Sequence, residues 1–176
     1  MSPGHLILVG LPGAGKTTVG PLIAAELGVE FADVDTLIEE RIGTPVATIF
    51  KDQGEEAFRA HERAFVADLV SGEAPMVIAP GGGWVVQDKA LESVAGLALT
   101  VYLEATPATA AVRARNGAVR PLLGPDQSGW EERIGELYRE RRRYYSACDL
   151  TVATGGLSAA QVARRVAELA RNHEGF

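Results

Sequence analysis

The chain has 176 residues, of which 47% are hydrophobic and 23% charged, and it contains no apolar run of the roughly 18 residues that a membrane-spanning helix needs. We therefore expect one domain, residues 1–176, with a single well-buried core. The net charge of −6 and the pI near 5.1 argue against non-specific binding to nucleic acid or to an anionic membrane. Anionic ligands must then be held by local positive sites.

The N-terminal residues and the single cysteine add little about function. The N-terminal apolar stretch is too short for a signal peptide and no Lys or Arg precedes it, so we expect a cytoplasmic protein. Cys148 can form no internal disulfide, and we assign it no role.

Strands and helices are expected to alternate along the chain. In order, the patterns predict a strand at 5–9, a helix at 16–27, a strand at 30–34, a helix at 35–42, a helical region at 45–70 with a break near Gly54, a strand at 76–79, a helix at 87–94, a strand at 98–104, helices at 107–115 and 130–146, a strand at 150–153 and a helix at 158–172. Asp35 is expected to begin the second helix, with Thr44 and Pro45 as N-cap and first position of the next. This alternation predicts a parallel sheet covered by helices on both faces.

Two glycine-rich segments interrupt the pattern. Residues 116–129, NGAVRPLLGPDQSG, form a long loop, and loops of that length in compact domains are often lids. Gly81, Gly82 and Gly83 follow the strand at 76–79. Each would weaken a regular element by roughly 0.5 to 1 kcal/mol, so together they must make a turn or let something approach the backbone.

The strongest chemical signal is GLPGAGKT, at residues 10–17, which fits G-x-x-x-x-G-K-[ST] in full between a predicted strand and a predicted helix. Gly13 and Gly15 allow backbone N–H groups to turn inward around phosphate oxygens, and the helix N-terminus adds partial positive charge. Lys16 is expected to reach the β and γ phosphates, and Thr17 to offer a hydroxyl to Mg²⁺. We therefore predict binding of a nucleoside triphosphate rather than a chance glycine turn.

The class of nucleotide-binding protein can be narrowed further. A signalling GTPase would carry the base-reading motif N/T-K-x-D, which does not occur in this sequence, and mechanical ATPases are typically longer. We therefore predict a small P-loop kinase, in which a second compartment on the same sheet holds a phosphate acceptor.

Two carboxylates mark such a compartment. Asp33 and Asp35 lie two apart where the second strand ends, at the edge where parallel α/β sheets place ligands. One would hold the water shell of the metal, and the other would accept a hydrogen bond from the acceptor hydroxyl. The alternative is that Asp35 caps the next helix and Asp33 is an ordinary polar residue at a strand end.

Arginines on two predicted helices are the other candidates. They belong to FRAHE, residues 58–62, and to RERRR, residues 139–143. By default, Arg59 is a solvated residue or an i,i+3 partner of Glu62, and the second run is a charged exterior face. In an acidic protein, these arginines could instead clamp a carboxylate or a phosphate.

Together, these motifs resemble the shikimate kinase family over nearly the whole chain. GLPGAGKTT, the D-x-D of FADVDT, the F-R-x-x-E of FRAHE, the GGG at 81–83, the VRPLL of the long loop and the ER-x-x-x-Y of ERRRYY occur in the family's order and near its spacing. The resemblance implies a P-loop NTPase fold of the nucleoside-monophosphate-kinase type: three α/β/α layers, a five-stranded parallel sheet in order 2-3-1-4-5 and a lid. It also implies an enzyme that uses ATP and Mg²⁺ to phosphorylate the 3-hydroxyl of shikimate, giving shikimate 3-phosphate for aromatic amino acid biosynthesis.

The resemblance assigns a role to each matching position. ATP would be bound by Gly13, Ala14, Gly15, Lys16, Thr17, Thr18, Arg113 near the adenine and Arg120 of the lid. The acceptor-binding region would be about 33–62. Shikimate would be bound by Asp35 and Arg59 of this region and by Gly81, Gly82, Gly83 and Arg141, with the arginines holding its carboxylate. Mg²⁺ would be held by Thr17 and, through water, by Asp33. Catalysis would rest on Lys16 and Arg120, which stabilise the transferring phosphoryl group, and on Asp35, which orients or deprotonates the attacking hydroxyl.

Some positions depart from the family's pattern. Pro80 leads into the glycine triplet and Trp84 ends it, so we expect an indole beside the acceptor pocket, where it could narrow or reshape the pocket. TGGL, residues 154–157, lacks an arginine that some members carry, and Arg139 and Arg142 remain alternatives to Arg141. The rival functions are a related kinase for another hydroxy acid such as gluconate and a non-catalytic ligand-binding domain. We expect a monomer with no nucleic acid or membrane partner.

Overall fold

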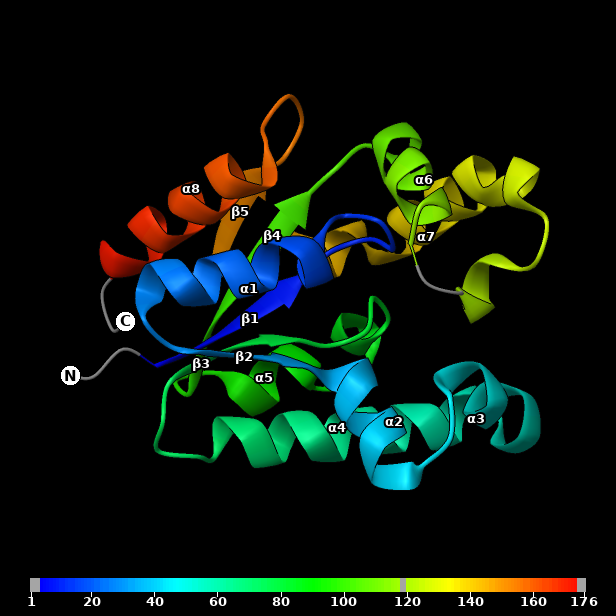
Figure 1. Ribbon diagram of the computed structural model, residues 1–176, viewed down its shortest axis with the longest axis horizontal. Coiled ribbons are helices and arrows are strands. Elements are labelled where there is room, and N and C mark those ends of the chain that lie inside the picture. The colour runs from blue at the N-terminus through cyan, green and yellow to red at the C-terminus, as the bar shows by residue number, and fades with distance from the viewer. Residues whose placement is uncertain (1–3, 118–119, 174–176) are drawn as a thin grey trace.

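The computed structural model describes residues 4–117 and 120–173, and in these residues five parallel strands form one sheet in the order β2-β3-β1-β4-β5 (Figure 1). The strands are β1 His5–Val9, β2 Glu30–Asp33, β3 Met76–Ala79, β4 Ala98–Glu104 and β5 Leu150–Ala153. All pairings are parallel, and Leu6 of β1 lies opposite Val77 of β3 and Leu99 of β4. The predicted sheet order is confirmed, and four strands match the predicted residues while β2 ends one residue early.

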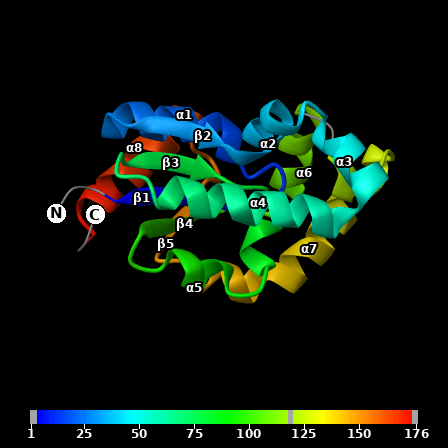
Figure 2. The same cartoon turned by 90° about the horizontal axis from the view of Figure 1, so that it is seen from below.

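Helices cover both faces of the sheet, as predicted. They are α1 Lys16–Leu27, α2 Val34–Ile42, α3 Val46–Gln53, α4 Glu55–Val70, α5 Ala90–Val94, α6 Pro107–Arg115, α7 Trp130–Tyr145 and α8 Ala159–Arg171. In Figure 2, α1 and α8 lie on one side of the sheet, whereas α5 and α7 lie on the other. Strand residues such as Leu6, Ile7 and Leu8 are fully buried because both faces are covered.

Two helix starts differ from the prediction. Asp33, rather than Asp35, is the N-cap of α2: its backbone is extended, and its Oδ1 accepts from the Thr36 N–H at 3.2 Å. Pro45, rather than Thr44, is the N-cap of α3. No threonine cap is needed there because Glu39 of the preceding helix accepts from the backbone N–H at the first helical position, with an Oε1 to N distance of 2.8 Å.

The segment after the glycine triplet also differs from the prediction. A single 3₁₀ turn, Trp84–Val86, precedes α5, which begins only at Ala90, so the helix predicted over 87–94 is shorter than expected. The predicted lid, 116–129, includes residues 118 and 119, which lie outside the described residues. Its remainder contains two 3₁₀ turns, Pro121–Leu123 and Gln127–Gly129. Among the described residues, no helix is both long enough and apolar enough to cross a membrane.

Candidate active site

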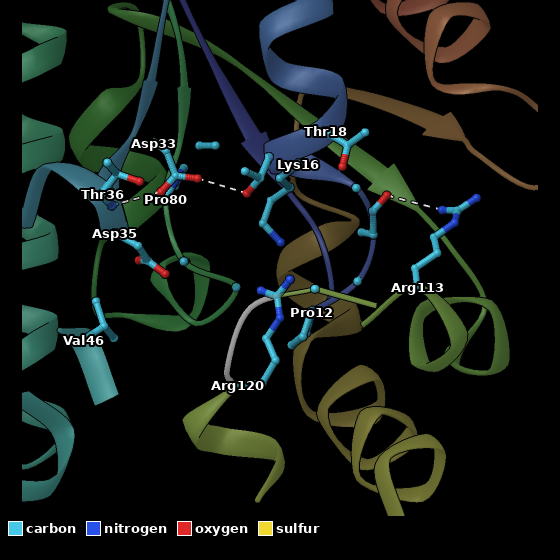
Figure 3. A pocket seen from close by; sticks show the side chains of 18 of the residues that line it. Pro12, Lys16, Thr18, Asp33, Asp35, Thr36, Val46, Pro80, Arg113 and Arg120 are labelled. Carbon is cyan, nitrogen blue, oxygen red and sulfur yellow. Dashed lines mark hydrogen bonds between the residues drawn. The ribbon is translucent and has the colours of Figure 1, made fainter. Parts of the chain in front are cut away.

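A cavity of about 880 Å³ opens at the carboxyl ends of the strands, where parallel α/β sheets bind ligands (Figure 3). The glycine loop after β1 lines one part of it, and the two predicted aspartates and the glycine triplet line another. The first turns of α3 and α4, part of α6 and the segment around Arg120 complete the wall. The cavity is large enough to hold two small ligands side by side.

The glycine loop has the conformation that phosphate binding requires. Gly13 and Gly15 have φ angles of 83° and 104°, in the left-handed region that favours glycine. A Cβ on Gly13 would lie 2.0 Å from the Ala110 carbonyl oxygen, so only glycine fits there. The N-cap of α1 is Gly15, which has no side chain to cap the helix, so the first N–H groups of α1 are free to bind an anion.

Lys16 lies at the centre of the cavity, half-buried, and its Nζ donates to two carbonyl oxygens of the preceding loop at 2.7 and 3.1 Å. Burial, followed by the positive charges of Arg120 and Arg141, lowers the pKa of Lys16 to about 7, although Asp35 and Asp33 oppose the shift. An anion bound beside this amine would favour its charged form. The lysine is therefore placed to gain its full charge when phosphates arrive.

Asp33 connects the end of β2 to the glycine loop. Its Oδ2 accepts from the Thr17 hydroxyl at 2.9 Å, while its other oxygen caps α2. No group of three or more His, Cys, Asp or Glu side chains that could hold a metal occurs in residues 4–117 and 120–173. A cation at Thr17 and Asp33 would therefore need further oxygen ligands from phosphate or water, which is how Mg²⁺ is usually bound beside nucleotides.

Asp35 has a buried carboxylate oxygen that accepts no hydrogen bond from the described residues. This oxygen, Oδ1, makes no hydrogen bond within residues 4–117 and 120–173, although the residue lines the cavity (Figure 3). Burial and the charge of Asp33 raise the pKa of Asp35 to about 6, despite the lowering effect of Lys16, Arg59 and Arg120. A buried hydrogen-bond acceptor without a donor is unfavourable unless a ligand supplies the donor. A ligand hydroxyl would satisfy it.

Arg59 is held behind the glycine triplet by a buried ion pair. It is 6% exposed, and its Nη1 donates to Oε2 of the fully buried Glu62 at 2.7 Å. The other oxygen of Glu62 accepts from the Gly81 N–H at 2.7 Å. Burial raises the pKa of Glu62 to about 7, against the lowering effects of Arg59 and Gly81. This carboxylate thus joins helix α4 to the turn at 81–83.

The glycine triplet lets charged side chains approach the backbone. A Cβ on Gly83 would lie 2.2 Å from Arg59 Nη2, and a Cβ on Gly81 would lie 2.6 Å from Glu62 Oε1. The carbonyl of Gly82 accepts from Arg141 Nη1 at 2.9 Å. The three glycines therefore both make the turn and leave room for these contacts.

The arginine run on α7 has one buried member. Arg141 is 5% exposed and points to the glycine turn, whereas Arg139, Arg142 and Arg143 are exposed. Among the predicted acceptor arginines of this run, the structure therefore brings only Arg141 to the site.

Two further arginines, Arg113 and Arg120, line the cavity. Arg113 Nη1 donates to the Thr154 hydroxyl at 3.0 Å and to the Ala14 carbonyl at 3.4 Å, which ties α6 to the glycine loop. Arg120 points toward Lys16, and its buried Nε has no hydrogen-bond partner in the part of the chain that the structure describes (Figure 3). The cavity thus gathers cations around the glycine loop and the aspartates.

Comparison with known proteins identifies the family. A family model described as shikimate kinase matches residues 12–171. The chain belongs to the shikimate kinase family. Shikimate kinase from Moorella thermoacetica is 42% identical over 94% of this chain and 94% of its own, and that from Thermobifida fusca is 42% identical over 92% of each. The predicted family and the prediction of an ATP-dependent kinase are confirmed.

Solved structures agree with this assignment. Shikimate kinase from Acinetobacter baumannii, in complex with shikimate, has a TM-score of 0.89 to this chain at 32% identity, covering 98% of this chain and 96% of that one. A gluconokinase from Sinorhizobium meliloti has a TM-score of 0.61 at 22% identity, which shows a shared fold alone. The reading as a shikimate kinase is therefore favoured over the gluconate alternative.

Two features of this shikimate kinase family member were not anticipated from its sequence. Glu62 was expected only as a possible partner of Arg59, yet it is fully buried and holds the Gly81 N–H. A signal for its burial exists, because Phe58, Glu62, Val66 and Val70 follow one another at four-residue spacing along a helix, so Glu62 falls on the buried stripe.

The second feature is Trp84, for which the expectation was wrong. The indole is 2% exposed and does not line the cavity. The 3₁₀ turn Trp84–Val86 directs it into the core, where this turn contacts α4, α5 and α7. Trp84 therefore fills space behind the turn and does not narrow the pocket.

Proposed function

We propose that this protein transfers the γ-phosphoryl group of ATP to the 3-hydroxyl of shikimate. The observation that carries the proposal is the unpartnered, buried oxygen of Asp35, which lies in the same cavity as Lys16 and Arg59. The glycine loop and Lys16 suit phosphates, and the cations beyond Asp35 suit an acid that carries a hydroxyl. Shikimate, which is bound to the related Acinetobacter baumannii enzyme, has this chemistry.

In the proposed reaction, the acceptor hydroxyl oxygen bonds to the γ-phosphorus of ATP while the bond to the β,γ-bridging oxygen breaks, and the hydroxyl proton passes to Asp35. ADP and shikimate 3-phosphate are the products. Lys16 and Arg120 would neutralise charge on the transferring group, because this chemistry depends mainly on positioning and electrostatics. ATP would lie along Gly13, Ala14, Gly15, Thr17 and Thr18, with Arg113 on the adenine side.

The acceptor carboxylate would be held by Arg59 and Arg141, and Gly81, Gly82 and Gly83 would bring the backbone against the ring. Mg²⁺ fits the pair formed by Thr17 and Asp33, and when bound it would screen the phosphate oxygens. The segment that contains Arg120 would close over the bound ligands and exclude water, which would otherwise accept the phosphoryl group. We also propose that the protein acts in the cytoplasm, as a monomer.

A coupled assay of ADP release tests this proposal. ATP and Mg²⁺ would be supplied with shikimate, quinate, gluconate or a nucleoside monophosphate as the acceptor. We expect turnover with shikimate and kcat/KM at least about 100-fold lower with the others, because each lacks either the ring or the placement of the groups that the site must pair. Turnover of another acceptor without shikimate turnover would show that the proposal is wrong.

A further inference from the structure

The Glu62 carboxylate has a third donor, which lies outside the motifs already described. Gln87 Nε2 donates to Glu62 Oε2 at 2.8 Å, in addition to the Arg59 guanidinium and the Gly81 N–H. Gln87 closes the 3₁₀ turn that follows the glycine triplet, since its backbone N–H donates to the Trp84 carbonyl at 3.1 Å. The Gln87 side chain therefore links the end of the 3₁₀ turn to the carboxylate that holds Gly81, the first glycine of the triplet.

The orientation of the Gln87 amide is set from the protein surface. Arg63 Nη1 donates to Gln87 Oε1 at 2.7 Å, and Arg63 Nη2 donates to Glu56 at 2.9 Å. A guanidinium only donates, so it must face the amide oxygen, and the amide NH₂ is then directed toward Glu62. The Arg63 and Glu56 side chains are 44% and 84% exposed, so their ion pair itself adds little stability. Its effect is to fix which way the amide points.

Glu62 needs these donors because it is fully buried. A buried carboxylate keeps its charge only where hydrogen bonds and cations offset the loss of water. The charged groups that face it are Arg59, from its own helix, and Asp35, from α2, which opposes ionisation. Gln87 is a neutral hydrogen-bond donor, so it stabilises the Glu62 carboxylate without competing with the bound phosphate acceptor for Arg59.

We propose that Gln87 is a positioning residue for acceptor binding, which acts through Glu62 to hold the Arg59 guanidinium and the Gly81 backbone against the acceptor. The proposal rests on the function proposed above. If the Gln87 contact is lost, Glu62 retains one fewer donor, and both groups that it anchors are held less firmly. Among the residues that the structure describes, no hydrogen bond joins Gln87 to the nucleotide side of the cavity, so ATP binding should not respond.

The test is the change of Gln87 to Leu, which keeps the approximate volume and removes both the donor and the acceptor. Gln53→Leu serves as the matched control, because Gln53 is exposed at the end of α3. For Gln87→Leu, we expect the shikimate KM to rise about tenfold, with kcat within about threefold and the ATP KM within about twofold of wild type. The control should match wild type in all three.

The pH profile separates a positioning role from a general loss of stability. Glu62 must be ionised to hold its donors, so acceptor binding weakens as pH falls through its pKa of about 7. Without Gln87, the charged form is less stable, so the acid limb of kcat/KM for shikimate should move upward by about one pH unit. Arg63→Met, which keeps the Gln87 donor but frees its orientation, should raise the shikimate KM by only about two- to threefold.

The outcomes distinguish the two proposals. An unchanged shikimate KM with an unshifted acid limb in folded Gln87→Leu would overturn the positioning role, as would equal rises in both KM values. If that variant does not fold, the same readouts on Arg63→Met decide, and an unchanged shikimate KM there would overturn it too. Wild-type turnover of a different acceptor would refute only the proposed function, since the KM comparison can then be made with that acceptor.

Discussion

The two sides of the cavity are built in different ways. The nucleotide side is one continuous loop, residues 10–17, whose shape depends on glycines with positive φ and whose ligand groups are mostly backbone N–H groups. The acceptor side brings together residues from α2, α4, the turn at 81–83 and α7. The buried Glu62 joins α4 to this turn, and Arg141 joins α7 to it. One side is thus specified by local conformation, whereas the other depends on a network of charges between distant segments.

Burial shifts pKa values in opposite directions on the two sides of the cavity. On the nucleotide side, burial disfavours the charged form of a cation, Lys16, whereas on the acceptor side it disfavours the charged forms of two anions, Asp35 and Glu62. Lys16 is therefore mostly charged below about pH 7, whereas Asp35 and Glu62 are mostly charged only above about pH 6 and about pH 7. This difference predicts that the two binding steps can be perturbed separately.

Asp35→Asn should have the largest effect and should separate chemistry from nucleotide binding. The amide keeps the shape of the side chain but cannot accept the hydroxyl proton, so we expect kcat to fall about 10³-fold. ATP affinity should stay within about threefold, because the groups that hold the phosphates lie in the glycine loop. Steady-state kinetics and calorimetric titration of ATP measure the two quantities, and a large loss of ATP affinity would show that this carboxylate belongs to the nucleotide side.

Gly83→Ala should break the acceptor side alone. The φ angle of Gly83 is −92°, so alanine causes no backbone strain, but its Cβ would lie 2.2 Å from Arg59 Nη2. Displacing this guanidinium should raise the shikimate KM by about 10- to 100-fold with little change in ATP KM. Gly82→Ala provides a graded comparison, because its Cβ would lie 3.2 Å from Arg141 Nη1, and a smaller rise is expected. Equal effects of the two variants would contradict this steric account.

The pH dependence should show the opposite responses directly. The pKa values of Asp35 and Glu62 are raised to about 6 and about 7, so kcat/KM for shikimate should fall as pH drops through this range. The fall should be up to about tenfold per pH unit between pH 7 and 6, and up to about 100-fold per unit below pH 6, where both groups are protonated. The pKa of Lys16 is lowered to about 7, so ATP affinity should weaken as pH rises above 7.

Lys16→Arg is the control for the nucleotide limb, because a guanidinium stays charged throughout this range. The weakening of ATP binding at high pH should disappear in this variant. If ATP affinity in the wild type were to improve as pH rises, the proposed role of the Lys16 charge would be wrong.

The difference between the two sides also explains what the sequence could reveal. The glycine loop and α1 were predicted residue for residue, because the information lies in consecutive residues with a fixed geometric purpose. The sheet order came instead from the family resemblance. On the acceptor side, residue type and position offered candidates, and only the resemblance chose among them, since their contacts join segments far apart in the chain. Glu62 and Gln87 show the limit: they are 25 residues apart, and no local pattern indicates that the amide of one meets the carboxylate of the other.

Helix caps were mispredicted for a related reason. Thr44 has the right residue type for a cap, but Pro45 is the N-cap of α3, and the Val46 N–H donates instead to the Glu39 carboxylate of the preceding helix. The preference of residue types for cap positions cannot predict that a backbone N–H donates to a side chain from another part of the fold. Trp84 is a similar case, because its neighbours in sequence are glycines of the site while its neighbours in space belong to the core.

Trp84→Phe should therefore have the smallest effect on activity, and it tests where the acceptor side ends. The indole is buried behind the turn and does not line the cavity, so shikimate and ATP KM values should stay within about twofold of wild type. Removing part of a buried ring leaves unfilled space, so the free energy of unfolding should fall by about 1 to 3 kcal/mol, measured by chemical denaturation. A rise in shikimate KM without loss of stability would instead place the indole in contact with the acceptor.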